Sequence, residues 1–155
     1  MYKYLSILII FLMSCEISNQ EKITDEEVKE KFHEFFDILS VKNPDKNKLY
    51  GLVTDDYYIF ENKRKYTMKE FIEFINSFKT IEDNWVLSDF KIYTDINSAH
   101  VTLKNKGKFL VETDSGKVTM NFEWLESAYL IKENNELKFN FYFSEVIKES
   151  VIKVD

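Results

Sequence analysis

Two glutamates interrupt otherwise apolar rows of side chains near the C-terminus of this 155-residue chain. Glu126 and Glu145 lie in two stretches, 117–132 and 136–148, whose alternating apolar residues predict long strands. Asn134-Asn135 is typical of a two-residue hairpin turn. This register would make the two glutamates diagonal cross-strand neighbours, about 7 Å apart between backbone positions.

Two carboxyls this close between apolar walls would repel each other, and burial would raise the pKa of at least one. One carboxyl could then donate a proton while the other accepts one. The candidate catalytic residues are therefore Glu126 and Glu145, acting as a general acid/base pair. Two other arrangements stay open, because both carboxyls can face solvent at the mouth of the fold, or a β-bulge can turn one outward.

The same register predicts which side chains share the inner face of the sheet. A second two-residue turn, at Ser115-Gly116, would extend that face to Phe109 and Val111. We expect it to pack on the helices, because burying one aromatic ring contributes about 1.5–3 kcal/mol. The inward-facing residues of the two long strands are then Val118, Met120, Phe122, Trp124, Glu126, Ala128, Leu130, Phe139, Phe141 and Phe143.

Three aromatic side chains are candidate ligand-binding residues: Tyr57, Trp124 and Tyr142. Tyr142 alternates with phenylalanines that the register turns inward, so a solvated face is the competing interpretation for it. The two histidines, His33 and His100, are isolated from any cluster of Asp or Cys, so no metal site is predicted. With three glycines in the chain and no phosphate-binding loop, no cofactor is predicted either.

The composition indicates one globular domain. Apolar residues make up 45% of the chain and aromatic residues 16%, which excludes a disordered protein. The net charge of −6 argues against nucleic-acid binding, which needs a basic face. The single cysteine excludes an internal disulfide bond.

The N-terminus has the layout of a secretory signal, with an early lysine and an apolar run too short to span a bilayer. Leu12, Met13, Ser14 and Cys15 resemble the bacterial lipobox. The resemblance implies cleavage before Cys15, lipidation of its thiol, and a membrane-anchored protein of the bacterial cell envelope, with an outer-membrane location plausible. A buried N-terminal helix that contains a chance cysteine is the alternative. The predicted segments are a signal peptide (1–14), a lipidated cysteine with a tether (15–23) and a domain (24–150).

The elements that must position the candidate site begin with helices. Capping boxes at 24–27 and 67–70 start two of them, and Pro44 suits the first turn of a short third one. A short strand is expected at 55–61 and strands at 85–94 and 99–113, before the two long C-terminal strands.

This order of elements resembles the nuclear-transport-factor-2-like superfamily, close to its SnoaL-like and ketosteroid-isomerase-like bacterial members. The pattern that carries the resemblance is the strand and capped helix from Tyr57 to Phe78 and the closing hairpin around Asn134. It implies an α+β fold in which a cone-like curved antiparallel sheet wraps around three N-terminal helices. Many relatives have a histidine where this chain has Tyr142, two residues before a serine, and this departure weakens the enzymatic interpretation.

The function that we expect from the sequence is a non-catalytic domain that binds a small apolar ligand or a partner protein, inside a cone well filled by aromatic side chains. The alternative is an isomerase-, dehydratase- or cyclase-like enzyme that uses Glu126 or Glu145 as its acid/base. An empty pocket of roughly 300 Å³ or more on which both glutamates converge would favour the enzyme, and a cone plugged by phenylalanine side chains would favour the binding domain. The outer sheet face could support a homodimer, and its residues are Thr119, Asn121, Glu123, Leu125, Ser127, Tyr129 and Ile131.

Overall fold

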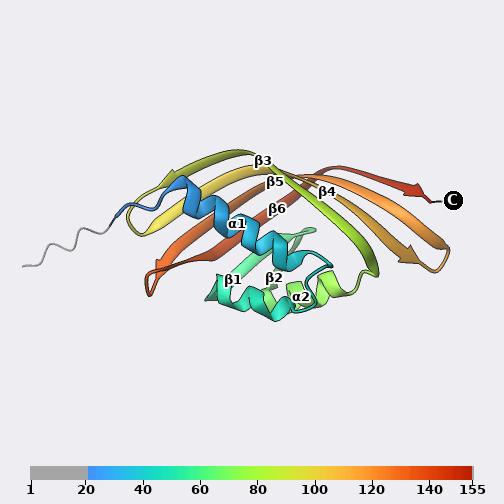
Figure 1. Ribbon diagram of the computed structural model, residues 1–155, viewed down its shortest axis with the longest axis horizontal. Coiled ribbons are helices and arrows are strands. Elements are labelled where there is room, and N and C mark those ends of the chain that lie inside the picture. The colour runs from blue at the N-terminus through green and yellow to red at the C-terminus, as the bar shows by residue number, and fades with distance from the viewer. Residues whose placement is uncertain (1–20, 155) are drawn as a thin grey trace, which may run out of the picture.

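Three helices lie on one face of a six-stranded curved, open sheet in the computed structural model, which describes residues 21–154 (Figure 1). The predicted α+β class and the curved sheet around three helices are confirmed. The elements in chain order are α1 (Asp25–Leu39), η1 (Lys46–Leu52), β1 (Val53–Glu61), β2 (Arg64–Thr67), α2 (Met68–Asn76), β3 (Thr80–Thr94), β4 (Ser98–Thr113), β5 (Gly116–Glu133) and β6 (Glu136–Lys153).

The strands are arranged in the order β2-β1-β6-β5-β4-β3. All neighbours are antiparallel except β1 and β6, which run parallel. The hairpin from β1 to β2 was not predicted from the sequence. Its turn is Asn62-Lys63, and both residues have a positive φ, as a two-residue hairpin turn requires.

Both predicted capping boxes are present, and they fix where the two α-helices begin. The Thr24 hydroxyl accepts from the Glu27 amide while the Glu27 carboxylate accepts from the Thr24 amide, and Thr67 and Glu70 repeat this arrangement. Between the α-helices, the short third helix is η1, a 3-10 helix. The helices therefore start where their sequences specify, independently of the sheet.

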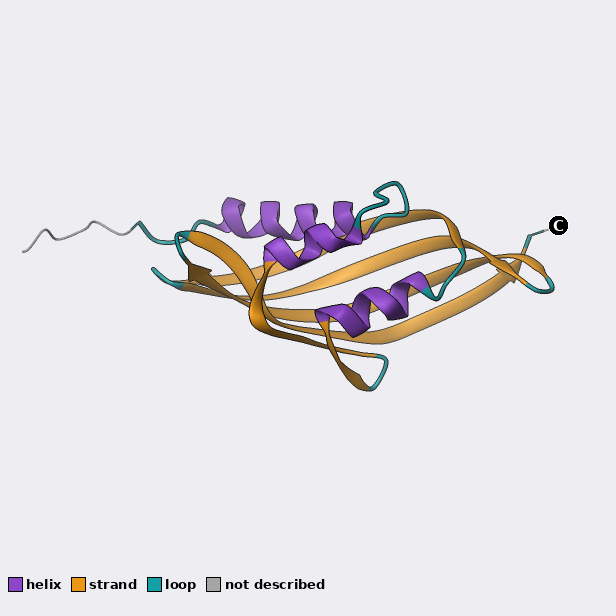
Figure 2. Ribbon diagram, turned by 90° about the horizontal axis from the view of Figure 1, so that it is seen from below, coloured by secondary structure: helices purple, strands orange, loops and turns teal. Residues whose placement is uncertain are grey.

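The helices cover only part of the sheet. Figure 2, which looks onto the helical side, shows that the end of the sheet nearest the C-terminus extends beyond them, and Figure 1 agrees. At the other end, α1 packs over the sheet with Val28 and Phe32 wholly buried against Val101, Leu130 and Phe139. Among the described residues, no helix is long and apolar enough to cross a membrane.

The register of the C-terminal hairpin differs from the prediction beyond its first few pairs. Asn134 and Asn135 form the expected tight turn, and Leu130 pairs with Phe139 as predicted. A β-bulge then makes Asn140 an extra residue on β6, so that Tyr129 pairs with Phe141. One extra residue reverses the facing of the side chains that follow it, here until a second register shift between Glu123 and Trp124 restores the original facing.

The prediction that Phe141 and Phe143 face inward is therefore wrong. Phe143 is 37% exposed, and Phe141 packs against Tyr58 and Phe60 on the outer face. The bulge is held by a polar contact that the register argument did not include, because the Asn140 amide donates to Asp56 at 2.9 Å. Tyr142 and Ser144 occupy the inner face instead, and both are buried.

The hairpin between β4 and β5 also differs in detail. Its turn residues are Asp114 and Ser115, so Phe109 pairs with Met120 rather than with Phe122. The shift is an even number of residues, which leaves the predicted inner face intact: the Phe109 and Phe122 rings still lie 6.0 Å apart.

Candidate functional site

A cavity of about 710 Å³ opens between the helices and the inner face of the sheet. Its apolar wall comes from α1, α2 and the long strands, and includes Phe36, Phe71, Trp85, Phe122 and Trp124. The cone is therefore not filled by its aromatic side chains, which corrects the expectation from the sequence. The volume is in the range of small-molecule sites.

Glu126 from β5 lies in this cavity, buried among apolar groups. It is 6% exposed, and two side chains from neighbouring strands hold its carboxyl. The Tyr142 hydroxyl donates to Oε2 at 2.7 Å, and the Asn105 amide donates to Oε1 at 3.1 Å. Both partners are at least as buried as the glutamate, so the three side chains form a fixed polar group inside the core.

The surroundings of Glu126 bring the pKa of its carboxyl close to neutral pH. Burial raises the pKa of Glu126 to about 7, and repulsion from Glu61 acts in the same direction. The hydrogen bonds from Tyr142 and Asn105 oppose this rise. A carboxyl with a pKa near the working pH can both take and return a proton.

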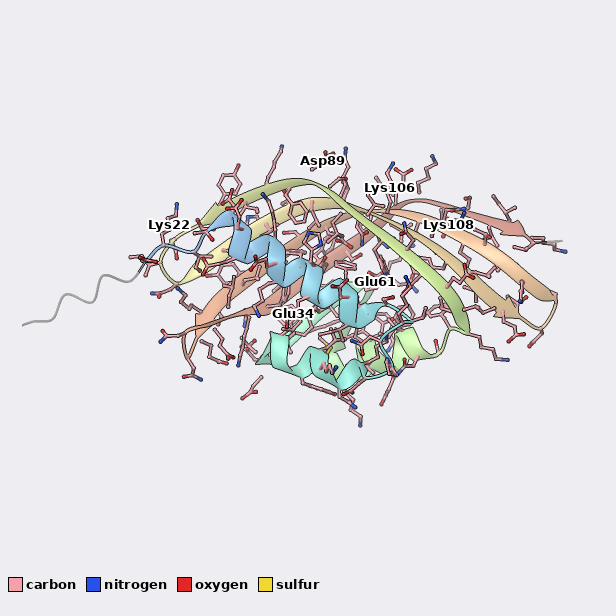
Figure 3. The ribbon with its side chains drawn as sticks, viewed as in Figure 1. Lys22, Glu34, Glu61, Asp89, Lys106 and Lys108 are labelled. Carbon is pink, nitrogen blue, oxygen red and sulfur yellow. The ribbon has the colours of Figure 1, made fainter. Side chains whose placement is uncertain are left out.

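Glu61, at the end of β1, is the second carboxyl of the cavity. Burial raises its pKa, with the Ser144 hydroxyl and the Asn62 amide opposing that shift. Figure 3 labels Glu61 on the helical side of the molecule, whereas Asp89 and Lys106 project from the outer margin of the sheet. The acid pair of this protein is thus Glu61 and Glu126, from strands that the sequence does not pair.

The predicted pair of Glu126 and Glu145 is not formed. Glu145 pairs with Leu125, and both side chains are exposed on the outer face. The bulge at Asn140 turns Glu145 away from the cavity. This is one of the arrangements that the sequence left open. Glu126 keeps its predicted inward position, since the inner row of β5 is uninterrupted there.

The three candidate ligand-binding aromatics are placed differently from one another. Trp124 and Tyr142 both line the cavity, and Tyr142 is 2% exposed rather than solvated. Tyr57 is also buried, but it is not among the lining residues. Whether any of them binds a ligand stays a prediction.

Several buried polar atoms near the cavity lack a hydrogen-bond partner within the described part of the chain. They are the Tyr57 hydroxyl, the Asn105 carbonyl oxygen and the indole N–H groups of Trp85 and Trp124. Unpaired buried polar atoms are costly and rare in proteins. Ordered water or a bound ligand can satisfy such atoms.

Sequence reasoning missed Asn105 and Glu61, although a signal existed for the first. Asn105 continues the inward row of Ala99, Val101 and Leu103 on β4, so a polar residue interrupts an apolar row there. Glu61 gave no such signal, because it is the last residue of a strand whose neighbours were unknown.

Two further predictions concern metals and the lipid anchor. Residues 21–154 contain no group of three His, Cys, Asp or Glu side chains arranged to hold a metal ion. Cys15 and the lipobox residues Leu12, Met13 and Ser14 lie outside the described residues, so lipidation stays a prediction.

Solved structures of similar fold include a type 2 hexachlorocyclohexane dehydrochlorinase, with a TM-score of 0.70 and 7% identity, covering 84% of this chain and 89% of that chain. A protein assigned as a scytalone dehydratase from Novosphingobium aromaticivorans gives a TM-score of 0.66 and 13% identity, covering 84% and 88%. A protein assigned as a calcium/calmodulin-dependent protein kinase II association domain from Xanthomonas campestris gives 0.63 and 16%, covering 78% and 86%.

This likeness concerns the fold alone, because the sequence identities are low. The expected nuclear-transport-factor-2-like cone is thereby confirmed as the architecture. No protein-family model matches the chain, and no curated protein matches its sequence.

Proposed function

We propose that the cavity is the active site of an enzyme that removes a proton from carbon in a small apolar molecule and eliminates a neighbouring group. The observation that carries the proposal is the Glu126 carboxyl, buried in a cavity of about 710 Å³ with its pKa near 7. The proposal takes the alternative left open by the sequence, now with Glu61 in place of Glu145.

The proposed step uses two of the carboxyls that line the cavity, Glu126 and Glu61, in different roles. Ionised Glu126 takes the proton from a substrate C–H bond, and that bond's electron pair forms a carbon–carbon double bond. The leaving group departs from the adjacent carbon with its own bonding pair and takes a proton from Glu61, whose raised pKa keeps it protonated more often than an exposed glutamate.

Tyr142 and Asn105 act on this step as positioning residues. Their hydrogen bonds at 2.7 and 3.1 Å fix the plane of the Glu126 carboxyl, so that little reorganisation is needed when the proton moves. Two proteins of similar fold have names that specify the loss of hydrogen chloride and of water, which supports an elimination more than another reaction.

The proposal can be tested with 5-nitrobenzisoxazole, a neutral compound that opens to a coloured phenolate when a base removes the C–H proton of its isoxazole ring and the N–O bond breaks. We expect the wild-type rate to exceed that of Glu126→Gln by roughly 100-fold or more. The rate should rise with pH through a midpoint near the Glu126 pKa of about 7.

Glu30→Gln is the matched control, because it makes the same change at an exposed position of α1. It should leave the rate unchanged. Equal rates for the wild type and Glu126→Gln would refute the proposed function. Ligand binding without catalysis, which we expected from the sequence, would then be favoured by the aromatic lining of the cavity.

We also propose that Cys15 carries the lipid that anchors this domain at the bacterial envelope. The support is the match of residues 12–15 to the lipobox and the net charge of −6, which gives the domain no attraction of its own for anionic headgroups. Labelled palmitate should enter the wild-type protein and not Cys15→Ser. The variant should also leave the membrane fraction, and an unchanged distribution would contradict the anchor.

A homodimer through the outer sheet face is a further proposal. The outward turn of β6 adds Phe143, 37% exposed, to Leu125 and Tyr129, 46% and 39% exposed. Some proteins of similar fold are named as association domains, which fits such an assembly loosely. Sedimentation equilibrium should give a dimer for the wild type and a monomer for Leu125→Glu. A monomeric wild type would exclude this interface.

A further inference from the structure

The charged side chains of the cavity are nearly all acidic. Glu61, Asp83, Glu126 and Glu149 line it, and among the described lining residues Lys46 is the one basic side chain. A concave site with walls of low polarity concentrates the field of its charges. The sign of that field is therefore part of the site's specificity.

Lys46 does not offset this excess of acids, because its ammonium is fully used. It donates to the Ile38 and Asn43 carbonyls at 2.8 Å each and to the Ser40 carbonyl. Asp83 is used in the same way, since its carboxylate accepts from the Ser40 hydroxyl at 2.7 Å and from the Val41 amide at 2.8 Å. These two opposite charges stabilise the loop after α1.

The acids that remain are Glu61, Glu126 and Glu149, with no described basic residue to pair them inside the cavity. Glu61 and Glu126 repel each other in the absence of a ligand. A positive charge beside them would replace this repulsion with attraction, whereas a negative charge would add to it.

The walls next to these acids are aromatic. Trp85 and Trp124 lie with ring centroids 5.8 Å apart, and Phe109 and Phe122 contact them. Aromatic faces attract cations, and a quaternary ammonium combines positive charge with an apolar surface. Trp124 is only 8% exposed and its indole N–H has no partner among residues 21–154, so this wall also leaves a buried donor that an acceptor atom of a ligand can satisfy.

We propose that the cavity selects a cationic apolar ligand, namely a ring or branched alkyl group that bears a quaternary or protonated amine, with its charge beside Glu61 and Glu126. The inference deepens the proposed function, because it takes the same cavity as the substrate site. It adds the charge of the substrate, which the elimination chemistry does not specify.

Three soluble probes of similar shape test the sign of the charge: benzyltrimethylammonium, benzyl methyl sulfone and phenylmethanesulfonate are cationic, neutral and anionic. The chain has two tryptophans and both line the cavity, so intrinsic fluorescence reports its occupancy. We expect the cation to bind about tenfold more tightly than the neutral probe, and the anion to bind more weakly than either.

Two further arms connect the preference to the named acids. Glu61→Gln should reduce the preference for the cation severalfold, while Glu30→Gln, the same change on the exposed face of α1, should not. In the unaltered protein, cation binding should tighten from about pH 5.5 to about pH 8.5, because Glu126 ionises in between, and the neutral probe should show no such trend. The pH arm needs no variant to fold.

Equal binding of the cation and the neutral probe, preferred binding of the anion, or no fluorescence response to the cation would overturn the inference. The result is separable from the elimination assay. A protein that opens nitrobenzisoxazole through Glu126 but binds the three probes alike keeps the proposed function and loses this inference. A protein that prefers the cation but does not open nitrobenzisoxazole keeps this inference and loses the proposed function.

Discussion

The two ends of the curved sheet are lined by similar aromatic and aliphatic residues, yet only one end is closed. At the end nearest the start of α1, Phe32, Val101, Leu130 and Phe139 are wholly buried. At the other end, Trp85, Phe109 and Phe122 are only partly buried and surround the cavity. The difference is that α1 covers the first end, whereas no helix of residues 21–154 covers the outermost part of the second.

Polar atoms follow the same division. The closed end pairs its rings edge to face, with Phe32 and Phe139 at 5.0 Å. The unpaired indole N–H groups and the Glu126 carboxyl belong to the region where the packing opens. Close packing is thus concentrated at one end and the cavity at the other, and Glu126 lies close to the boundary.

The largest expected effect is a difference in folding stability between variants at the two ends of the sheet. Phe139→Ala should destabilise the protein by about 3–5 kcal/mol, because it leaves a cavity in a fully packed region. Phe122→Ala at the open end should cost much less, because that ring is already partly exposed. Urea denaturation of both variants measures the difference, and equal losses would show that the open end is as rigid as the closed one.

The next effect concerns how the stability depends on pH. The pKa of Glu126 is about 7 in the folded protein and near 4.5 when unfolded, so the folded state binds more protons between these values. Stability should therefore fall as pH rises from 4.5 to 7, by an amount on the order of 2–3 kcal/mol.

Glu126→Gln should remove that decline, and the unpartnered Asn105 carbonyl oxygen can accept from the new amide after a flip of the Asn105 side chain. Thermal unfolding of both proteins across this pH range checks the sign. A wild-type stability that rises with pH through the same window would mean that Glu126 is not buried as the structure places it.

A smaller effect is expected from a substitution at Gly107, which tests the packing at the open end of the sheet. A Cβ at Gly107 would lie 2.6 Å from the Phe109 ring and 2.8 Å from the Trp124 ring, so both rings would have to move. Gly107→Ala should cost about 1–3 kcal/mol and change the tryptophan emission. Gly51→Ala, where a Cβ meets nothing within 4 Å, is the control, and equal effects would contradict the packing of the open end.

The smallest effect is confined to the site. Tyr142→Phe removes the hydroxyl that donates to Glu126, so the pKa of that carboxyl should rise and the midpoint of the pH–rate curve should move up by about one unit. The maximum rate on nitrobenzisoxazole separates this role from a structural one, since lost packing would lower the rate without moving the midpoint.

Much of the fold could be read from local patterns. The capping boxes at Thr24 and Thr67 and the turn at Asn134 need only neighbouring residues, and all three are present. The inner row of β5, from Trp124 to Leu130, alternates without interruption, so its facing was predicted correctly and Glu126 with it.

The facing of β6 could not be predicted in the same way. Phe139, Phe141 and Phe143 offer one apolar row, but Tyr142 can be buried as well once its hydroxyl has an acceptor. The choice depended on Asn140, which bonds to Asp56 of β1, and on Glu126, which accepts from Tyr142. Both partners are distant in sequence.

By itself the sequence determined where the two α-helices begin, where the last hairpin turns, which row of β5 faces inward, and that one carboxyl lies in that row, because each depends on contacts between near neighbours. Only the tertiary structure decided that Glu61 rather than Glu145 accompanies Glu126, and that Tyr142 and Asn105 hold it. An extra residue at Asn140 reverses the facing of β6 until the second register shift opposite Glu123 and Trp124, and Asn140 is held by a hydrogen bond between strands far apart in the chain.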